Sequence, residues 1–251
     1  MLNIIVSGIN GRMGKAIEEL CMNDEGLQII AGIDINLGVP HKFPTVATAA
    51  EIDTKADVII DFSHHSCAKM LCEYAVSTST PIVFSTTGYT SEELDIINDA
   101  AKHVAVFTSA NMSLGVNLLI ELAKQTAKIL PGFDIEIVEK HHNQKLDAPS
   151  GTALMIADNI KDVRADSKYV YDRSNVRQKR EKSEIGIHAV RGGTIVGEHD
   201  VIFAGHNEVL TISHSAQSRE VFASGAISAA KFISTQAAGM YHMADMISKT
   251  N

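Results

Sequence analysis

Short apolar runs recur along the first half of the chain, and each is followed by a glycine-rich or polar turn and then by a helix-forming segment. The runs cover residues 2–7, 27–33, 56–62, 81–85 and 103–107. Fully apolar strands that alternate with helices are typical of a parallel sheet whose two faces are both covered. The pattern therefore predicts an α/β chain that begins with a Rossmann-type parallel sheet.

The pattern changes after residue 133. Residues 133–138 alternate between apolar and polar side chains, as in a strand with one buried face, and residues 153–160 favour a helix. Three further strand-like runs follow at residues 185–191, 194–203 and 208–214. Glycine-containing turns at 192–193 and 205–207 join these runs, which favours antiparallel hairpins. We therefore predict a second, smaller α+β domain built around the strand at residues 133–138.

Two segments of the second half have a distinct composition. Residues 164–182 carry seven Lys or Arg residues without a period, so we expect a long exposed loop with solvated charges rather than a binding patch. Residues 219–247 form a helical run rich in small side chains, which suits close packing on the first domain. The predicted first domain is thus residues 1–112 and 219–251, and the second is residues 113–218.

A glycine pattern follows the first strand and opens the first helix. Gly8, Gly11 and Gly14 form G-x-x-G-x-x-G, a variant of the dinucleotide fingerprint. Glycines at these positions permit a tight turn and a close approach of the backbone to a pyrophosphate. Because ligands bind at the carboxyl ends of parallel strands, Thr86, Thr87 and Ala110 are expected to face the same side. The first domain is therefore predicted to bind a dinucleotide.

Asp34 ends the second strand, where an acidic side chain can accept hydrogen bonds from ribose hydroxyls. The alternative is that Asp34 is only a turn residue at the strand end. Ile35 follows it, in place of an arginine that would hold a 2′-phosphate. This favours NAD(H), while Arg12 in the glycine turn leaves NADP(H) open.

The side chains best suited to catalysis are concentrated between residues 139 and 153, in the stretch E-K-H-H-N-Q-K-L-D-A-P-S-G-T-A. His141 and His142 can exchange a proton near neutral pH, and Lys145 adds a positive charge. Gly151 and Thr152 offer donors at the positive end of the following helix. Together these groups suit a carboxylate substrate that needs one proton.

Two other interpretations of this stretch are weaker. The S-G-T segment could be a helix N-cap alone, with the two histidines as surface residues. A zinc site is disfavoured because adjacent histidines point apart and neither Cys nor a helical H-x-x-x-H accompanies them.

Composition and charge limit the class of protein. The formal charge of −8 and the isoelectric point of about 5.7 argue against nucleic acid as a partner. The three cysteines lack C-x-x-C spacing and are expected to be reduced, buried thiols: Cys21, Cys67 and Cys72. The first strand begins almost at Met1, leaving no room for a secretory signal, and no apolar run approaches the roughly 18 residues of a membrane span. We expect a soluble, cytoplasmic protein that does not contact a membrane.

Over nearly its full length the chain resembles the 4-hydroxy-tetrahydrodipicolinate reductase (dihydrodipicolinate reductase) family. The most specific part is H-H-N-Q-K-L-D-A-P-S-G-T, which matches the family's signature. Further similar segments are G-R-M-G near the start, T-T-G at Thr86, N-M-S-L-G-V-N from Asn111, and G-G-T-I-V-G-E-H, F-A-G and H-S-A-Q-S-R-E-V-F-A-S-G-A between residues 191 and 230. Two positions depart from the family's pattern: Ser85 replaces the usual glycine before T-T-G, and Ile35 replaces a frequent arginine.

The resemblance implies an NADH- or NADPH-dependent reductase of lysine and diaminopimelate biosynthesis that acts on a small dicarboxylate. It implies that His141 is the general acid and that Lys145, helped by His142, binds and polarises the substrate. Gly151 and Thr152 would hold a substrate carboxylate. The dinucleotide would contact Gly8, Gly11, Arg12, Met13, Asp34, Ser85, Thr87, Gly88, Ser109, Ala110 and Met112. The family also implies a homotetramer assembled through the second domain, which would bind substrate.

Two competing hypotheses remain at this point. One is a related two-domain dehydrogenase that acts on another amino-acid-derived acid, such as aspartate. The other is a nucleotide-binding sensor without catalysis, which should lose part of the H-H…K…S-G-T set. This chain keeps the whole set.

Overall fold

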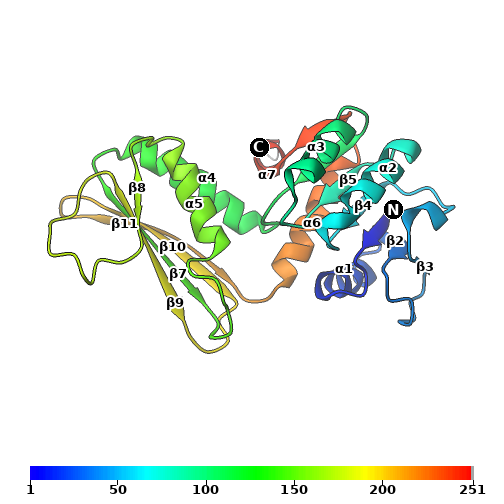
Figure 1. Cartoon of the computed structure of the whole chain (residues 1–251), viewed down its shortest axis with the longest axis horizontal. Coiled ribbons are helices and arrows are strands. Elements are labelled where there is room, and N and C mark those ends of the chain that lie inside the picture. Colours follow the sequence, from blue (N-terminus) through cyan, green and yellow to red (C-terminus); the bar gives the residue numbers. More distant parts are fainter. Residues whose placement is uncertain (250–251) are drawn as a thin grey trace. The chain divides into compact units, whose positions relative to one another are not determined.

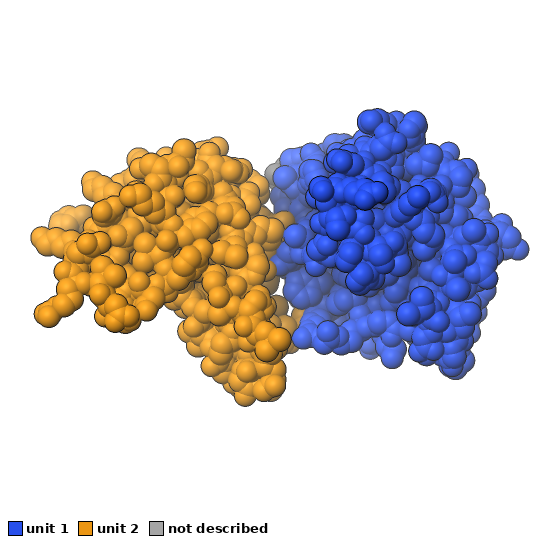
Figure 2. Space-filling model, in the orientation of Figure 1, with its two compact units in different colours: residues 1–114, 219–251 blue, residues 115–218 orange. Residues whose placement is uncertain are grey.

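The computed structural model describes residues 1–249. The chain divides into two compact units, shown in different colours in Figure 2. One unit comprises Met1–Leu114 and Arg219–Asn251, and the other comprises Gly115–Ser218.

The first unit is built on a parallel sheet. Its described strands are β1 (Leu2–Ser7), β2 (Leu27–Ile33), β3 (Thr45–Val46), β4 (Val58–Asp61), β5 (Ile82–Phe84), β6 (Ala105–Thr108) and β12 (Gly239–Tyr241). They lie in the order β12-β6-β5-β4-β1-β2-β3, and every neighbouring pair is parallel. The predicted Rossmann-type sheet is confirmed. The prediction of an all-helical C-terminal segment is wrong at β12, because pairing with β6 makes a strand of three residues that have no strand pattern of their own.

Helices cover both faces of this sheet (Figure 1). The helices are α1 (Arg12–Met22), α2 (Ala68–Thr78), α3 (Ser91–Ala100), α6 (Glu220–Ile233) and α7 (Met243–Ser248), with 3₁₀ turns η1 (Ala49–Glu51) and η2 (His65–Cys67). Ile4 of β1 packs in the same core as α1, α6 and α7, whereas its neighbour Ile5 packs against α2 and α3. This follows from the alternation of side chains along a strand.

The C-terminal segment packs on the first unit, as predicted. Ala223, Ala226 and Ala230 of α6 are fully buried in its core. A Cβ atom on Gly225 would lie 1.7 Å from the carbonyl oxygen of Met112, so only glycine allows the helix to come this close.

The second unit is a mixed sheet with helices on one face. Residues 115–218 are all described, and their strands are β7 (Asp134–His141), β8 (Lys168–Val170), β9 (Glu184–Arg191), β10 (Gly197–Ala204) and β11 (Val209–Ala216). The order β11-β10-β7-β9-β8 places β7 at the centre, as predicted. The core lies between this sheet and the helices α4 (Leu114–Ile129) and α5 (Gly151–Lys161).

The predicted hairpin between β9 and β10 is wrong. β7 lies between these strands, parallel to β9 and antiparallel to β10. The turn at Gly192 and Gly193 bonds to the end of β7, where Gly192 N–H donates to the His141 carbonyl and the Gly193 carbonyl accepts from Asn143 N–H. The hairpin between β10 and β11 is confirmed.

The basic segment at residues 164–182 is not simply a solvated loop. It contains β8, and the Arg180 side chain is 17% exposed because it binds the sheet. Arg180 donates to the carboxylates of Asp134 and Glu136, each at 2.9 Å. Period-based reasoning did not find this role, because ion pairs across strands leave no period in the sequence.

Two further expectations concern the cysteines and membrane segments. All three cysteines lie within the described residues and are free; Cys21 and Cys72 are buried, whereas Cys67 is half-buried. Within the part of the chain that the structure describes, no helix is both long and apolar enough to cross a membrane.

Candidate active site

The glycine turn between β1 and α1 has the geometry that the sequence pattern predicts. Gly8 has a φ of +78°, and a Cβ atom there would lie 2.6 Å from the carbonyl oxygen of Phe62. A Cβ on Gly14 would lie 2.3 Å from the Ile9 carbonyl oxygen, so α1 packs directly on the turn. Gly11 is the N-cap of α1, and Arg12 and Met13 form its first turn. The turn therefore presents backbone, without side chains, at the carboxyl end of β1.

Asp34 follows β2 and holds two backbone groups. Its Oδ2 accepts from Asn10 N–H at 2.9 Å, and its Oδ1 accepts from Asn36 N–H at 2.9 Å. Asp34 thus acts as a turn residue, and its half-buried carboxylate also lines a cavity of about 280 Å³ with Gly8 and Gly11. A carboxylate has about four lone-pair sites, so these two bonds leave capacity for ribose hydroxyls.

A second cavity, of about 430 Å³, lies on the other side of the glycine turn. Its lining residues are Arg12, Met13, Phe62, Ser63, His64, His65, Ser85, Thr86 and Thr87. The two cavities share Phe62, Ser63 and His64. They lie at the carboxyl ends of the paired strands β1 and β4, where the strand order reverses, which is the usual ligand position in a doubly wound sheet.

The buried carboxylate of Asp61 organises the loops around this second cavity. Asp61 ends β4 and accepts from the hydroxyls of Ser63 at 2.5 Å and Thr86 at 2.7 Å. Burial raises the pKa of Asp61, although these hydrogen bonds oppose the shift. His64, the next residue, caps the 3₁₀ turn η2, where its side chain accepts from Ser66 N–H.

Of the remaining residues expected at the dinucleotide, only some line one of these two cavities. Ser85 is buried beside the second cavity, and its hydroxyl has no hydrogen-bond partner among residues 1–249. Gly88 has a φ of +83°, and the Ser109 hydroxyl donates to the Asn111 carbonyl at 2.7 Å. Met112 is only 2% exposed and packs in the core with α6. The described lining of the two cavities does not include Gly88, Ser109, Ala110 or Met112.

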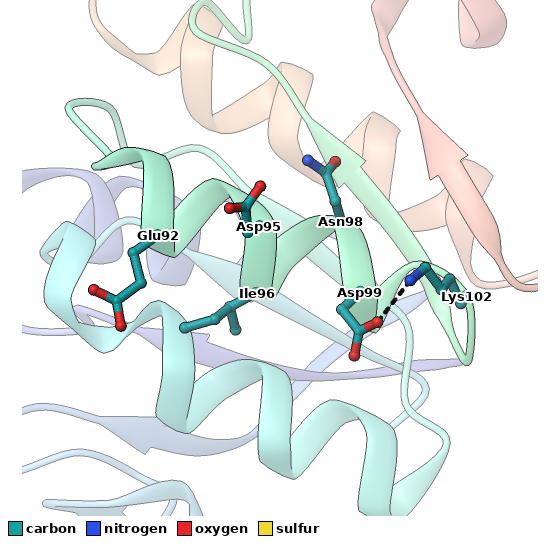
Figure 3. Close-up of a pocket in the computed structure, with 6 residues that line it drawn as sticks. All are labelled: Glu92, Asp95, Ile96, Asn98, Asp99 and Lys102. Atoms are coloured by element: carbon teal, nitrogen blue, oxygen red, sulfur yellow. Dashed lines mark hydrogen bonds and ion pairs between the residues drawn. The ribbon is translucent and has the colours of Figure 1, made fainter.

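A different hollow, on α3, lacks these features. Figure 3 shows its lining side chains, with Asp99 paired to Lys102. The lining residues are Glu92, Asp95, Ile96, Asn98, Asp99 and Lys102. No glycine turn or strand end contributes to this lining, so it is an acidic groove on the helix surface.

In the second unit, Glu139 and His141 lie on one face of β7. The strand extends three residues beyond the predicted end, so His141 is its last residue rather than part of the loop. Glu139 has no exposed surface and accepts from Arg191 through both oxygens, each at 2.7 Å. It also accepts from Ser150 N–H at 2.9 Å. Burial pushes the pKa of Glu139 upward, but the bonds from Arg191, His141 and Ser150 outweigh it and hold the pKa below its usual range.

His141 is oriented by this carboxylate. Its Nδ1 lies 2.7 Å from Oε2 of Glu139, which can only accept, so Nδ1 carries a proton. Its Nε2 faces the backbone of Gly197, where a Cβ atom would lie 3.0 Å away. Burial lowers the pKa of His141 despite the opposing effect of Glu139, and the positive charges of Lys145 and Arg191 add to the decrease.

His199 and Ser150 complete the cluster. The two imidazoles of His141 and His199 meet edge to face, with ring centroids 5.3 Å apart. Burial, together with a smaller effect of the neighbouring His141, lowers the pKa of His199 to about 4. Its Nε2 lies 3.0 Å from the Ser150 hydroxyl, which also accepts from Ala153 N–H as the N-cap of α5. The predicted N-cap is therefore present within the polar cluster.

Lys145 lies on the same connection. Its Nζ forms an ion pair with Asp147 at 2.9 Å, and the lysine side chain is 21% exposed. Arg191 donates to the Asp147 carbonyl at 2.7 Å and so ties this loop to Glu139. His142 is half-buried, and Gly151 and Thr152 begin α5. The predicted substrate-side residues thus lie at the end of β7, on the connection that follows it and at the start of α5.

Sequence reasoning missed Glu139, Arg191, His199 and Asp61. One signal was available, because E-x-H in a strand places both side chains on the same face. Arg191 and His199 lie on β9 and β10, and the sequence did not reveal that these strands are the neighbours of β7.

Comparison with known proteins identifies the family. Residues 2–112 match the model "Dihydrodipicolinate reductase, N-terminus", and residues 115–247 match "Dihydrodipicolinate reductase, C-terminus". The second match includes residues 219–247, which pack on the first unit here.

Several relatives are similar over their full length. The 4-hydroxy-tetrahydrodipicolinate reductase of Caldanaerobacter subterraneus subsp. tengcongensis is 54% identical over 250 residues, which is 99% of both chains. That of Clostridium novyi is 47% identical over 253 residues, covering 100% of both chains.

Two solved structures share the fold. A dipicolinate-bound dihydrodipicolinate reductase from Paenisporosarcina sp. TG-14 has a TM-score of 0.84 at 25% identity, over 96% of this chain and 97% of that one. A C. glutamicum DAP dehydrogenase in complex with DAP has a TM-score of 0.58 at 12% identity, over 96% of this chain and 92% of that one, and shows the likeness of fold alone. The family models and the full-length relatives together establish that this chain belongs to the 4-hydroxy-tetrahydrodipicolinate reductase (dihydrodipicolinate reductase) family.

Proposed function

We propose that this chain reduces 4-hydroxy-2,3,4,5-tetrahydrodipicolinate to tetrahydrodipicolinate in lysine and diaminopimelate biosynthesis, with NAD(P)H as reductant and His141 as proton donor. Family membership supports the reaction. The observation that carries the residue assignment is the Glu139–His141 pair at the end of β7, on the same connection as Lys145 and the start of α5.

The proton step follows from the hydrogen bonds of His141. Loss of the 4-hydroxyl as water leaves a ring imine conjugated with an alkene, which takes a hydride at one carbon and a proton at its neighbour. Because Glu139 binds the proton on Nδ1, the second proton of the imidazolium is on Nε2 and is the one delivered. A lowered pKa makes this imidazolium a stronger acid. Such a positioned acid contributes about 10² to 10⁴ in rate.

Two sets of cationic or donor groups would bind the substrate carboxylates. Lys145, helped by His142, is assigned to one carboxylate, which would compete with Asp147 for the ammonium group. The N–H groups of Gly151 and Thr152, at the positive end of α5, are assigned to the other. Two anchors would fix which ring carbon receives the hydride. On this proposal the second unit is the substrate-binding domain.

The residues around the glycine turn fit a dinucleotide. Gly8 leaves no side chain over the turn, and Asp34 offers a carboxylate to a ribose. Ser85, whose buried hydroxyl has no partner among the described residues, lines the second cavity. A bound reduced nicotinamide supplies a hydride to an electrophilic carbon. We assign this role to the first unit, with Arg12, Met13 and Thr87 beside Ser85 at the second cavity. Gly11 lines the first cavity, and Gly88, Ser109, Ala110 and Met112 would support the site from the loops after β5 and β6.

NADH is the favoured reductant. Asp34 lines the first cavity beside Ile35, which is 94% exposed and carries no charge to hold a 2′-phosphate. Arg12 lines the second cavity and is not part of the described lining of the first. Without a neighbouring cation, the negative charge of Asp34 disfavours binding of a 2′-phosphate. We therefore expect the protein to prefer NADH, or to use both NADH and NADPH.

We also propose that the chain forms a homotetramer through its second unit, as the family resemblance implies. Strand β11 is an edge of its sheet, and Val209 and Leu210 on it are 65% and 44% exposed. Light scattering coupled to size exclusion would measure the mass of the assembly; a monomer would refute this assignment.

The reaction is tested with NADH or NADPH and the freshly made product of dihydrodipicolinate synthase, by following nicotinamide absorbance at about 340 nm. We expect substrate-dependent loss of absorbance, with a higher kcat/KM for NADH. No loss above background with either reductant would refute the proposed reaction. His141→Gln should lower kcat by about 10² or more while the Kd of NADH stays within about twofold. An equal loss of NADH binding would show that His141 does not act on the substrate.

A further inference from the structure

The side chain of Asn10 joins the glycine turn to the loop between β2 and β3. Its backbone N–H donates to Asp34 Oδ2 at 2.9 Å, and its Nδ2 donates to the Asn36 carbonyl at 2.6 Å. Its Oδ1 lies 2.9 Å from Nε2 of His41. Asn10 therefore contacts both the beginning and the end of this loop.

The chemistry of these partners fixes the proton on Nε2. The Asn36 carbonyl can only accept, so the nitrogen of the Asn10 amide must face it. The amide oxygen then faces His41, and it too can only accept. His41 must therefore donate from Nε2 to the Asn10 amide oxygen.

The other nitrogen of His41 also faces an acceptor. Nδ1 lies 3.1 Å from Oε1 of Glu18 in α1, and the His41 and Glu18 side chains are only 3% and 14% exposed. The ring therefore has a hydrogen-bond partner at each nitrogen, Asn10 at Nε2 and Glu18 at Nδ1. It also stacks on Phe43, with centroids 4.9 Å apart and planes 17° from parallel. We call His41, Asn10 and Glu18 the His41 cluster.

The loop has few other restraints near Asp34. Ile35 and Leu37 are 94% and 53% exposed, so burial of their side chains does not fix the loop. Asp34 in turn bonds one N–H from the glycine turn and one from the loop, at Asn10 and Asn36. Its orientation toward the first cavity thus depends on the turn and the loop staying together.

We propose that His41 is a positioning residue for dinucleotide binding: through Asn10 and Glu18 it holds the β2–β3 loop on the glycine turn, so that Asp34 is preset to receive the ribose. This inference rests on one part of the proposed function, namely that the first unit binds NAD(P)H. Holding a loop in its bound conformation raises affinity because the free protein then loses less freedom on binding.

The test is the Kd of NADH, measured by fluorescence titration without substrate. His41→Leu removes both ring nitrogens, and so both hydrogen bonds, but keeps an apolar contact for Phe43. We expect a Kd about tenfold higher, since the binding-competent fraction falls, and a kcat at saturating NADH within about twofold of wild type. Glu18→Gln keeps an acceptor for Nδ1 and should change the Kd by less than about threefold. The matched control is His206→Leu, at an exposed turn of the second unit, which should leave the Kd unchanged.

A double-mutant cycle separates this role from general loss of structure. In an Asn10→Ala background, His41→Leu should raise the Kd by less than about twofold further, because its connection to Asp34 is already broken. Full additivity of the two changes would overturn the proposal, and so would an unchanged Kd in His41→Leu. Should His41→Leu fail to fold, an unchanged Kd in Asn10→Ala would overturn it instead. If the wild-type protein binds neither NADH nor NADPH, the proposed function fails rather than this inference.

Discussion

The Nδ1 atom of His141 lies 2.7 Å from Oε2 of Glu139, a carboxylate without exposed surface. Arg191 occupies the same carboxylate through both of its oxygens, so Glu139 stays ionised while its charge is largely balanced. The pair therefore orients the imidazole firmly without raising the pKa of His141, which burial keeps low. This combination suits an acid that must give up its proton.

Replacing Glu139 tests that relationship. Glu139→Gln keeps the shape but removes the charge that faces the imidazolium, so we expect kcat to fall by about 10²-fold. The pKa seen in the profile of kcat/KM against pH should move further down, because the imidazolium loses its carboxylate. Steady-state kinetics across pH would measure both effects.

Glu198→Gln is the matched control for that change. Glu198 belongs to the same sheet, pairs with Lys140 at 3.1 Å and lies beside it on the opposite face from His141. Glu198→Gln should leave the profile of kcat/KM against pH unchanged. If Glu139→Gln behaves like this control, Glu139 does not orient the acid.

The wild-type pH profile has a predicted direction. His141 must be protonated to act, and burial places its pKa below the ordinary value of 6.5. The acid form is lost as pH rises through this lowered pKa, so kcat/KM should decline with rising pH, with its inflection below that of an exposed histidine. An inflection above 6.5 that His141→Gln abolishes would contradict the environment described for this residue.

Gly197→Ala should disturb the orientation of His141. The new Cβ atom would lie 3.0 Å from Nε2, closer than about nine in ten contacts of real Cβ atoms. The ring cannot move away without weakening its bond to Glu139, so we expect kcat to fall by about tenfold with little change in the Kd of NADH. Unchanged turnover would mean that the imidazole has room to shift. Gly192→Ala, where a Cβ atom meets nothing within 4 Å, is the control.

His199 should make the protein sensitive to acid. Its pKa is about 4 in the folded chain against an ordinary 6.5, so below about pH 6.5 the unfolded chain takes up a proton that the folded chain resists. By about pH 5 this costs roughly 2 kcal/mol of unfolding free energy, and the loss is complete below about pH 4. His199→Gln, which can still bond Ser150, should lose correspondingly less stability on acidification. Urea unfolding at about pH 7.5 and about pH 5 would compare the two proteins, and equal losses would contradict the prediction.

Ser85 offers a test of the second cavity. Its buried hydroxyl has no partner among the described residues and borders the cavity assigned to the nicotinamide. If the dinucleotide satisfies it, Ser85→Ala should raise the Kd of NADH by about three- to tenfold, the effect of one hydrogen bond. Isothermal titration would measure the change, and an unchanged Kd would show that the hydroxyl does not contact the ligand.

The sequence by itself determined the local features of this protein. Runs of apolar residues predicted the strands β1, β2, β4, β5 and β6, because a strand covered on both faces has no polar side. The glycine turn at Gly8 and the N-cap at Ser150 were predictable because each depends on a residue's own backbone or side chain. The resemblance to the family was likewise recognisable in short motifs, such as H-H-N-Q-K-L-D-A-P-S-G-T.

Only the tertiary structure decided which strands are neighbours and which side chains meet. β7 lies between β9 and β10, and this order brings Arg191 and His199 to the Glu139–His141 pair. The same kind of long-range contact makes β12 a strand and attaches Arg180 to the sheet. A period in the sequence reports which face of an element is buried, but it does not report what covers that face, because many partners bury the same surface equally well.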